Sequence, residues 1–196
     1  EKQLPLSEKS RLSSGGLSAS EKGIIHHQFL QWLELKNEMT LEHLAIERDQ
    51  MIESGNLDPR AVIALDLQSI ADFWHTDIGQ TILNHHDQVH REMPFTARFG
   101  LSELKDIGLA HQINQTDEND FVIIQGIVDV AILGDESIQI LDYKTDLIDE
   151  QSLTSRLDKH RPQLELYAEA LQRIYQRPVP HKWLHFLTLK QTIEIS

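Results

Sequence analysis

The chain has 196 residues, 40% of them hydrophobic and 25% charged, which fits a folded domain with a real core and excludes an intrinsically disordered chain. Its formal net charge of −13 argues against a protein that binds nucleic acid by charge alone, because the surfaces of such proteins are basic. The absence of cysteine excludes disulfides, cysteine-ligated zinc and an Fe–S cluster.

The first half of the chain predicts mainly helices. Residues 1–17 read as a loop or tail, and the capping box SASE at 18–21 predicts a helix over 19–36. The start signal DPR, with aspartate as N-cap and proline at the first helical position, predicts a helix over 58–73. A short helix is expected over 76–83.

The second half predicts a sheet with a helix packed on it. GDES at 134–137 is a turn, and RPQLELYAEALQRIY at 161–175 predicts a helix with its proline near the start. The expected strands cover 90–99, 121–133, 138–144 and 183–189. The order of elements predicts an α+β or mixed α/β fold, with a mainly helical region over 1–88 and a sheet-containing core over 89–196.

The predicted hairpin brings three charged residues to one face. A symmetric turn at GDES places Asp129 opposite Asp142, where like charges destabilise a sheet unless a positive charge lies between them. Lys144 follows Asp142 by two residues and shares its face. We therefore predict a divalent metal site with a lysine beside it, and the alternative is a solvated, salt-bridged face. The opposite face carries the residues that can pack, Val128, Val130, Leu141 and Tyr143.

Five short motifs, in the same order along the chain, resemble a known family. They are Gly23–His27 (G-x-x-x-H), Arg91–Phe95 (R-E-x-P-F), Gly126–Asp129 (G-x-x-D), Asp142–Thr145 (D-Y-K-T) and Gln163–Tyr167 (Q-x-x-x-Y). Together they resemble the nuclease domain of the RecB and AddA helicase-nucleases, in the PD-(D/E)XK nuclease superfamily. The resemblance implies a restriction-endonuclease-like core, with a central mixed β-sheet flanked by helices.

The resemblance also implies a metal site. His27, Asp129 and Asp142 match the family's metal ligands, the backbone carbonyl of Tyr143 is a further candidate, and Lys144 matches the catalytic lysine, so that Asp129, Asp142 and Lys144 form the catalytic set. Carboxylates suit Mg²⁺ or Mn²⁺, and an imidazole ligand favours tolerance of Mn²⁺. Such a cation can activate water and offset charge on the transition state.

Other polar and aromatic residues have simpler alternatives. By resemblance Gln163, Tyr167 and Glu92 border the active site and position the substrate, although ordinary packing explains Tyr167 equally well, and Glu92 could merely end a strand. His27 alone could be a structural histidine. We expect His85, His86 and His90 on the surface, and the tryptophans in the core rather than as base-stacking platforms: Trp32, Trp74 and Trp183.

The sequence thus predicts a single Mg²⁺- or Mn²⁺-dependent deoxyribonuclease domain, an exonuclease that acts in double-strand-break repair and recombination. No ATP-binding motif is present, and the chain begins at Glu1, so we expect part of a longer helicase-nuclease in which an attached or partner helicase delivers single-stranded DNA. No apolar run approaches ~18 residues, so we expect no membrane partner and a cytoplasmic location. The alternatives are a catalytically silent DNA-binding or docking domain of the same fold and an unrelated metal-binding module.

Overall fold

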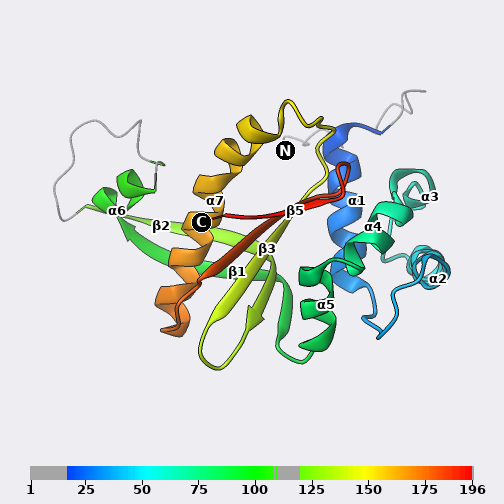
Figure 1. Ribbon diagram of the computed structural model, residues 1–196, viewed down its shortest axis with the longest axis horizontal. Coiled ribbons are helices and arrows are strands. Elements are labelled where there is room, and N and C mark those ends of the chain that lie inside the picture. Colours follow the sequence, from blue (N-terminus) through cyan, green and yellow to red (C-terminus); the bar gives the residue numbers. More distant parts are fainter. Residues whose placement is uncertain (1–16, 108, 110–119, 196) are drawn as a thin grey trace, which may run out of the picture.

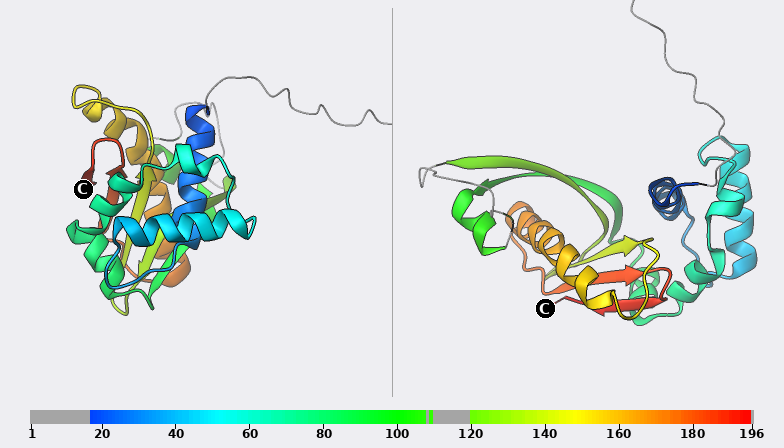
Figure 2. Two further views of the ribbon diagram at one scale, coloured as in Figure 1. Left: turned by 90° about the vertical axis from the view of Figure 1, so that its right-hand side faces the viewer. Right: turned by 90° about the horizontal axis from the view of Figure 1, so that it is seen from above.

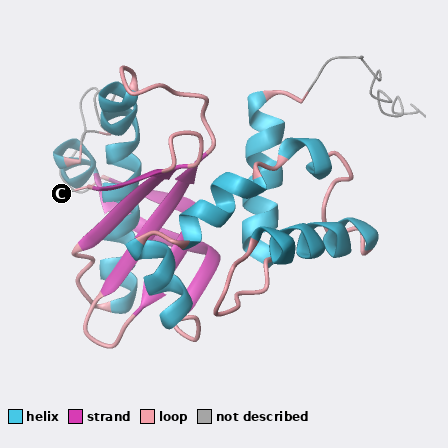
Figure 3. Ribbon diagram, turned by 45° about the vertical axis from the view of Figure 1, so that its right-hand side comes forward, coloured by secondary structure: helices cyan, strands magenta, loops and turns pink. Residues whose placement is uncertain are grey.

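The centre of the molecule is a five-stranded sheet with helices on both faces (Figure 1 and Figure 3). A computed structural model describes residues 17–107, 109 and 120–195, so the predicted tail lies outside this range except for Leu17. The strands are β1 (Val89–Gly100), β2 (Phe121–Leu133), β3 (Ile138–Lys144), β4 (His181–Phe186) and β5 (Gln191–Glu194). They lie in this order across the sheet, with β3 and β4 parallel and the other neighbours antiparallel. The predicted mixed α/β fold is confirmed.

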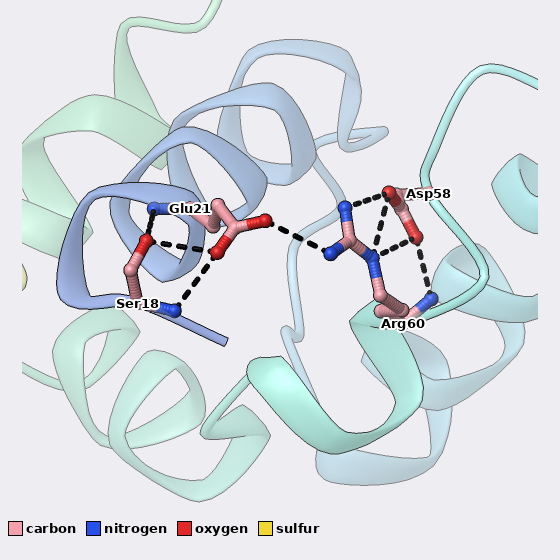
Figure 4. Close-up of polar contacts among 4 residues, drawn as sticks. All are labelled: Ser18, Glu21, Asp58 and Arg60. Atoms are coloured by element: carbon pink, nitrogen blue, oxygen red, sulfur yellow. Dashed lines mark hydrogen bonds and ion pairs between the residues drawn. The ribbon is translucent and has the colours of Figure 1, made fainter. Parts of the chain in front are cut away.

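Helix α1 (Ala19–Trp32) begins at the predicted capping box, in which the Glu21 backbone N–H donates to Ser18 Oγ over 3.2 Å. Arg60, the N-cap of the short helix α3 (Ala61–Ala64), joins this helix end to Asp58, with Nη1 2.9 Å from Glu21 Oε1 and Nη2 2.7 Å from Asp58 Oδ2 (Figure 4). These ion pairs are exposed to solvent and so contribute little to stability. The helix ends at Trp32, four residues before the predicted end.

The other N-terminal helices are α2 (Leu41–Glu53), α3 (Ala61–Ala64), α4 (Leu67–Trp74) and α5 (Asp77–Asn84). The predicted continuous helix over 58–73 is wrong, because the chain is extended at Leu65 and Asp66 caps a new helix by accepting from the Ser69 backbone N–H. The predicted helix over 76–83 is confirmed as α5, with Thr76 as its N-cap.

Helix α7 (Leu153–Tyr175) forms the crossover between the parallel strands β3 and β4, and α6 (Leu101–Asp106) follows β1. The prediction that α7 starts near Pro162 is wrong, since the helix begins eight residues before 161 and Pro162 lies inside it. A proline there removes one backbone hydrogen bond but fits where other contacts hold the helix. The predicted strand over 183–189 starts and ends earlier, at His181 and Phe186.

A hydrophobic core lies on each face of the sheet. One core joins α1–α5 to side chains such as Val130 and Tyr143, and the other joins α7 to side chains such as Ala131 and Ile140. The right-hand view of Figure 2 shows β1 and β2 curving away from the other strands and arching over α7. Among the described helices, none is long and apolar enough to cross a membrane.

The side-chain alternation of β1 and β2 reverses halfway along the two strands. Val130 packs in the core beside α1, whereas Val128 packs in the core beside α7, although residues two apart in a regular strand share a face. The reversal occurs at Asp129 and at Glu92 on the neighbouring strand, which has a left-handed backbone with a φ of 48°. The prediction that Val128 and Val130 share a face is therefore wrong. The reversal turns both carboxylates toward α1.

Candidate active site

Three side chains from separate elements converge where α1 meets β1 and β2. His27 Nδ1 of α1 lies 3.2 Å from Glu92 Oε1 of β1 and 3.5 Å from Asp129 Oδ1 of β2. One ligand atom from each lies within 4.8 Å of the others, a spacing that could hold a metal ion. We call these three residues the donor cluster.

The orientation of Asp129 is fixed from the neighbouring strand. Asp129 is buried, and its Oδ2 accepts a 2.7 Å hydrogen bond from the backbone N–H of Tyr143, which leaves Oδ1 facing His27. Because the N–H and C=O of one residue in a strand point to the same edge, the Tyr143 carbonyl also lies on the edge that faces Asp129. The β2–β3 ladder ends at Val130 and Leu141, two residues before Tyr143, so the predicted backbone pair of Asp129 with Asp142 is not formed and this edge is free of ladder pairing at Tyr143.

Asp142 and Lys144 form an ion pair next to the donor cluster. Lys144 Nζ lies 2.5 Å from Asp142 Oδ2, and the two side chains are 14% and 4% exposed. Burial and the negative charge of Asp129 raise the pKa of Asp142 to about 7, against the opposing effect of Lys144. Even beside Lys144, a carboxyl group with such a pKa is only partly ionised at neutral pH, and a further cation would favour its ionised form.

A line of hydrogen bonds holds Lys144 from α7. Lys144 Nζ donates to Gln163 Oε1 over 3.1 Å, and Gln163 Nε2 donates to the Tyr167 hydroxyl over 2.6 Å. The Tyr167 ring stands edge-on to Phe95 of β1 with ring centroids 5.4 Å apart. Gly126 lies against this pair, because a Cβ there would come within 2.5 Å of the Phe95 ring. The motifs Gln163–Tyr167 and Gly126–Asp129 thus contact each other beside Lys144.

The charge of His27 depends on its two carboxylate neighbours. Burial lowers the pKa of His27, but hydrogen bonds to Asp129 and Glu92 outweigh it and raise the pKa to about 10. An imidazolium at this position supplies the positive charge that the carboxylates need, and a metal ion would replace its proton.

Arg91 positions the helix that carries His27. Its Nη1 donates to the carbonyl oxygens of Leu30 and Leu33, over 2.9 and 2.6 Å, at the C-terminal end of α1. Gly23, at the other end of the helix, lies close to the loop after β3, because a Cβ there would meet Thr145 Oγ1 at 3.1 Å. Both contacts hold α1 against the sheet. The role of Arg91 was missed from sequence, although the motif R-E-x-P-F includes it.

The residues present fit a hard divalent cation. Glu92, Asp129 and Asp142 supply three carboxylates, and the positive charge nearby comes from His27 and Lys144. If His27 binds as neutral imidazole, a divalent cation and the lysine together balance the three carboxylates. Carboxylate-rich sites of this kind suit Mg²⁺ or Mn²⁺.

The structure places the other predicted residues as follows. His85, His86 and His90 are exposed as predicted, and Trp74 is buried in the core. Trp183 is partly buried against the same core. The prediction that Trp32 is a core residue is wrong, since it is 62% exposed in the last turn of α1.

Comparison with known proteins agrees with this geometry. The sequence profile of the PD-(D/E)XK nuclease superfamily matches residues 3–192. The chain belongs to this superfamily. The five-stranded mixed sheet flanked by helices is consistent with the restriction-endonuclease-like fold that the motifs implied.

The chain is also similar to curated bacterial proteins that are named as ATP-dependent helicase/nuclease subunits. It is 31% identical to the Lacticaseibacillus paracasei protein over 180 residues, covering 92% of this chain and 14% of that protein. It is 31% identical to the Listeria innocua protein over 191 residues, covering 94% and 15% respectively. The similarity to the AddA group of PD-(D/E)XK nucleases is therefore shown, and the chain spans about a seventh of the length of these relatives.

Proposed function

We propose that the chain is a metal-dependent deoxyribonuclease domain of a helicase-nuclease, and that it cuts DNA strands as an exonuclease during double-strand-break repair and recombination in the cytoplasm. The observation that carries this proposal is the donor cluster of His27, Glu92 and Asp129 beside the Asp142–Lys144 pair. A silent DNA-binding or docking domain would have no need for a half-buried lysine held within reach of a carboxylate cluster.

His27, Asp129, Asp142 and the Tyr143 carbonyl would hold the cation, which we propose to be Mg²⁺ or Mn²⁺. Glu92, which sequence alone assigned to substrate positioning, lies 3.2 Å from His27 and would complete the donor set. When bound, the cation supplies Lewis-acid stabilisation of charge on the phosphate and lowers the pKa of a water.

Lys144 would act on the reacting atoms. Its ammonium is fixed between Asp142 and Gln163, so it can orient the attacking water or stabilise negative charge that develops on the phosphate oxygens. Hydrolysis adds the water oxygen to phosphorus and breaks one P–O ester bond, and the leaving oxygen takes up a proton. Gln163 and Tyr167 keep the lysine in place on one side, and we propose that they border the path of the strand.

The substrate strand would come from the remainder of a longer protein. The relatives are named helicase/nuclease subunits and are several times longer than this chain. With a net charge of −13, this chain attracts a phosphate backbone poorly, so delivery by an attached or partner helicase would supply the local concentration that affinity does not.

The proposal is tested by cleavage of four substrates with Mg²⁺ or Mn²⁺: linear single- and double-stranded oligonucleotides labelled at either end, and closed circular single- and double-stranded DNA. An exonuclease shortens linear strands from an end and leaves closed circles intact. Cleavage of closed circles would show that the chain acts as an endonuclease and not as an exonuclease. No cleavage of any substrate by a folded, metal-loaded chain, even at high enzyme concentration, would favour the silent docking domain.

A further inference from the structure

Trp32 is an exposed aromatic side chain that neither core explains. It is 62% exposed in the last turn of α1, whereas Ile25, Phe29 and Leu30 of that helix are buried in the core. It lines a hollow of about 450 Å³ between the end of α1 and the first half of β1, together with Gln31 and Pro94. Pro94 is exposed as well, so the hollow has an apolar surface on both sides.

One residue of the donor cluster lines the hollow. Glu92 lines the hollow and also lies 3.2 Å from His27. His27 and Trp32 lie on the same helix, five residues and therefore about 7.5 Å apart along its axis and about 140° apart around it. Glu92 is therefore the link between the two places, and a strand with its scissile phosphate at the donor cluster would pass Glu92 and bring a neighbouring base to the indole.

The charges of the hollow favour the base of a strand over its phosphates. Arg91 lines the hollow and is cationic. Its guanidinium already donates hydrogen bonds to the carbonyl oxygens of Leu30 and Leu33 in α1 and its C-cap. Glu92 repels a phosphate at the inner end. Stacking on an aromatic ring needs no phosphate neutralisation and accepts every base, and it requires that the base be unpaired.

We propose that this hollow is a nucleobase-binding subsite, in which an unpaired base of the substrate strand stacks on Trp32 opposite Pro94. This inference rests on the proposed nuclease function and deepens it, because it assigns the binding of an unpaired base to Trp32. A paired base has both faces covered by its neighbours in the duplex and cannot enter the hollow.

The test compares wild type with Trp32→Ala, Trp32→Phe and the control Ile63→Ala, whose side chain is 77% exposed on α3 and lies away from the hollow. Binding of a single-stranded oligonucleotide in Ca²⁺ at low salt is followed by quenching of tryptophan emission and, for the variants, by anisotropy of a labelled strand. Trp32→Ala should weaken binding about 5- to 150-fold, equivalent to about 1–3 kcal/mol. Trp32→Phe should recover part of this loss, and Ile63→Ala should bind as wild type does.

A strand with one abasic nucleotide, moved step by step along the sequence, separates stacking from other roles of Trp32. At one position the abasic strand should bind wild type as weakly as Trp32→Ala binds the intact strand, with no further loss when both changes are combined. Equal affinity of wild type and Trp32→Ala, or additive losses at every position, would overturn the proposal and would indicate a surface that another part of a longer chain covers. Because binding is measured without cleavage, a catalytically silent chain would still give a clear result.

Discussion

Replacement of Lys144 by methionine removes the ammonium group and keeps most of the volume of the side chain. In the structure the group is 2.5 Å from Asp142 Oδ2 and donates to Gln163 over 3.1 Å, and the side chain is only 14% exposed. The substitution therefore leaves a buried carboxylate and a side-chain amide without their shared partner. We expect a protein that still folds and still binds metal, and that has lost cleavage.

The expected losses differ between stability and catalysis. Breaking a buried ion pair costs about 3–5 kcal/mol when the remaining charge cannot be neutralised. Asp142 can be neutralised, because burial and Asp129 raise its pKa to about 7, so the loss should be smaller, about 1–3 kcal/mol. For cleavage, removal of a preorganised charge-stabilising group costs about 10²- to 10³-fold in kcat.

Lys182 offers a matched control. It also joins a strand to α7, with Nζ 3.0 Å from Glu165 Oε2, and its side chain is also 14% exposed. Lys182→Met should therefore lose stability in urea unfolding while it keeps the cleavage rate of wild type. Rates are measured at saturating Mn²⁺ on a single-stranded oligonucleotide, with metal affinity determined separately by calorimetry.

Full cleavage by a folded Lys144→Met protein would refute the catalytic role and leave the lysine as a structural partner of Asp142. An equal loss of cleavage in Lys182→Met would show that the assay reports general destabilisation.

Three further predictions follow from separate parts of the structure. Arg91→Met removes the donor that holds the end of α1, so His27 should be placed less accurately and Mn²⁺ affinity should fall about 10- to 100-fold by calorimetry; unchanged affinity would contradict this role. Burial lowers the pKa of His185 from 6.5 to about 4, so the unfolded state takes up a proton first and stability should fall as the pH drops through this window, by up to about 1.4 kcal/mol per pH unit. Urea unfolding in EDTA should show this slope in wild type and a flatter one in His185→Gln. The isolated chain should bind DNA weakly at moderate salt with Ca²⁺, no tighter than the ~10⁻⁴–10⁻⁶ M of non-specific binders, and sub-micromolar affinity in filter binding would reveal an unrecognised basic groove.

The hairpin was predictable because local signals agreed with the global fold. The strands over 121–133 and 138–144 are confirmed residue for residue, and the register through Ala131 and Ile140 follows from the symmetric turn. The motifs brought His27 and Asp129 together before any geometry was known, because the family pattern relates the two positions whatever the local geometry of the strand.

The reversal at Glu92 was not predictable from local sequence. A left-handed backbone is usually signalled by glycine or asparagine, and a glutamate gives no such signal. The reversal takes Glu92 out of the regular strand face and into the donor cluster. The exposure of Trp32 was missed for a related reason, because it depends on where α1 ends and on what faces that end.

Helix boundaries were predicted wrongly where two sequence signals competed. Pro162 resembles a helix start, but the helix passes through it, since packing on the sheet compensates for one missing hydrogen bond. Conversely, the apolar spacing over 58–73 continues across Leu65 and Asp66, where the backbone leaves the helix and α4 is capped anew. Periodicity reports the buried face and is insensitive to a short break that preserves it.

The most direct test of the metal-dependent nuclease is a Mn²⁺ titration of single-strand cleavage by wild type and Asp129→Asn at equal enzyme concentration. This substitution removes a charge from the centre of the donor cluster and keeps an acceptor for the Tyr143 backbone N–H. We predict that wild type cleaves with a saturable dependence on Mn²⁺ and stops in EDTA, and that Asp129→Asn shows no cleavage at any concentration of the metal. Cleavage that persists in EDTA, or an Asp129→Asn curve that overlays the wild-type curve, would contradict the account.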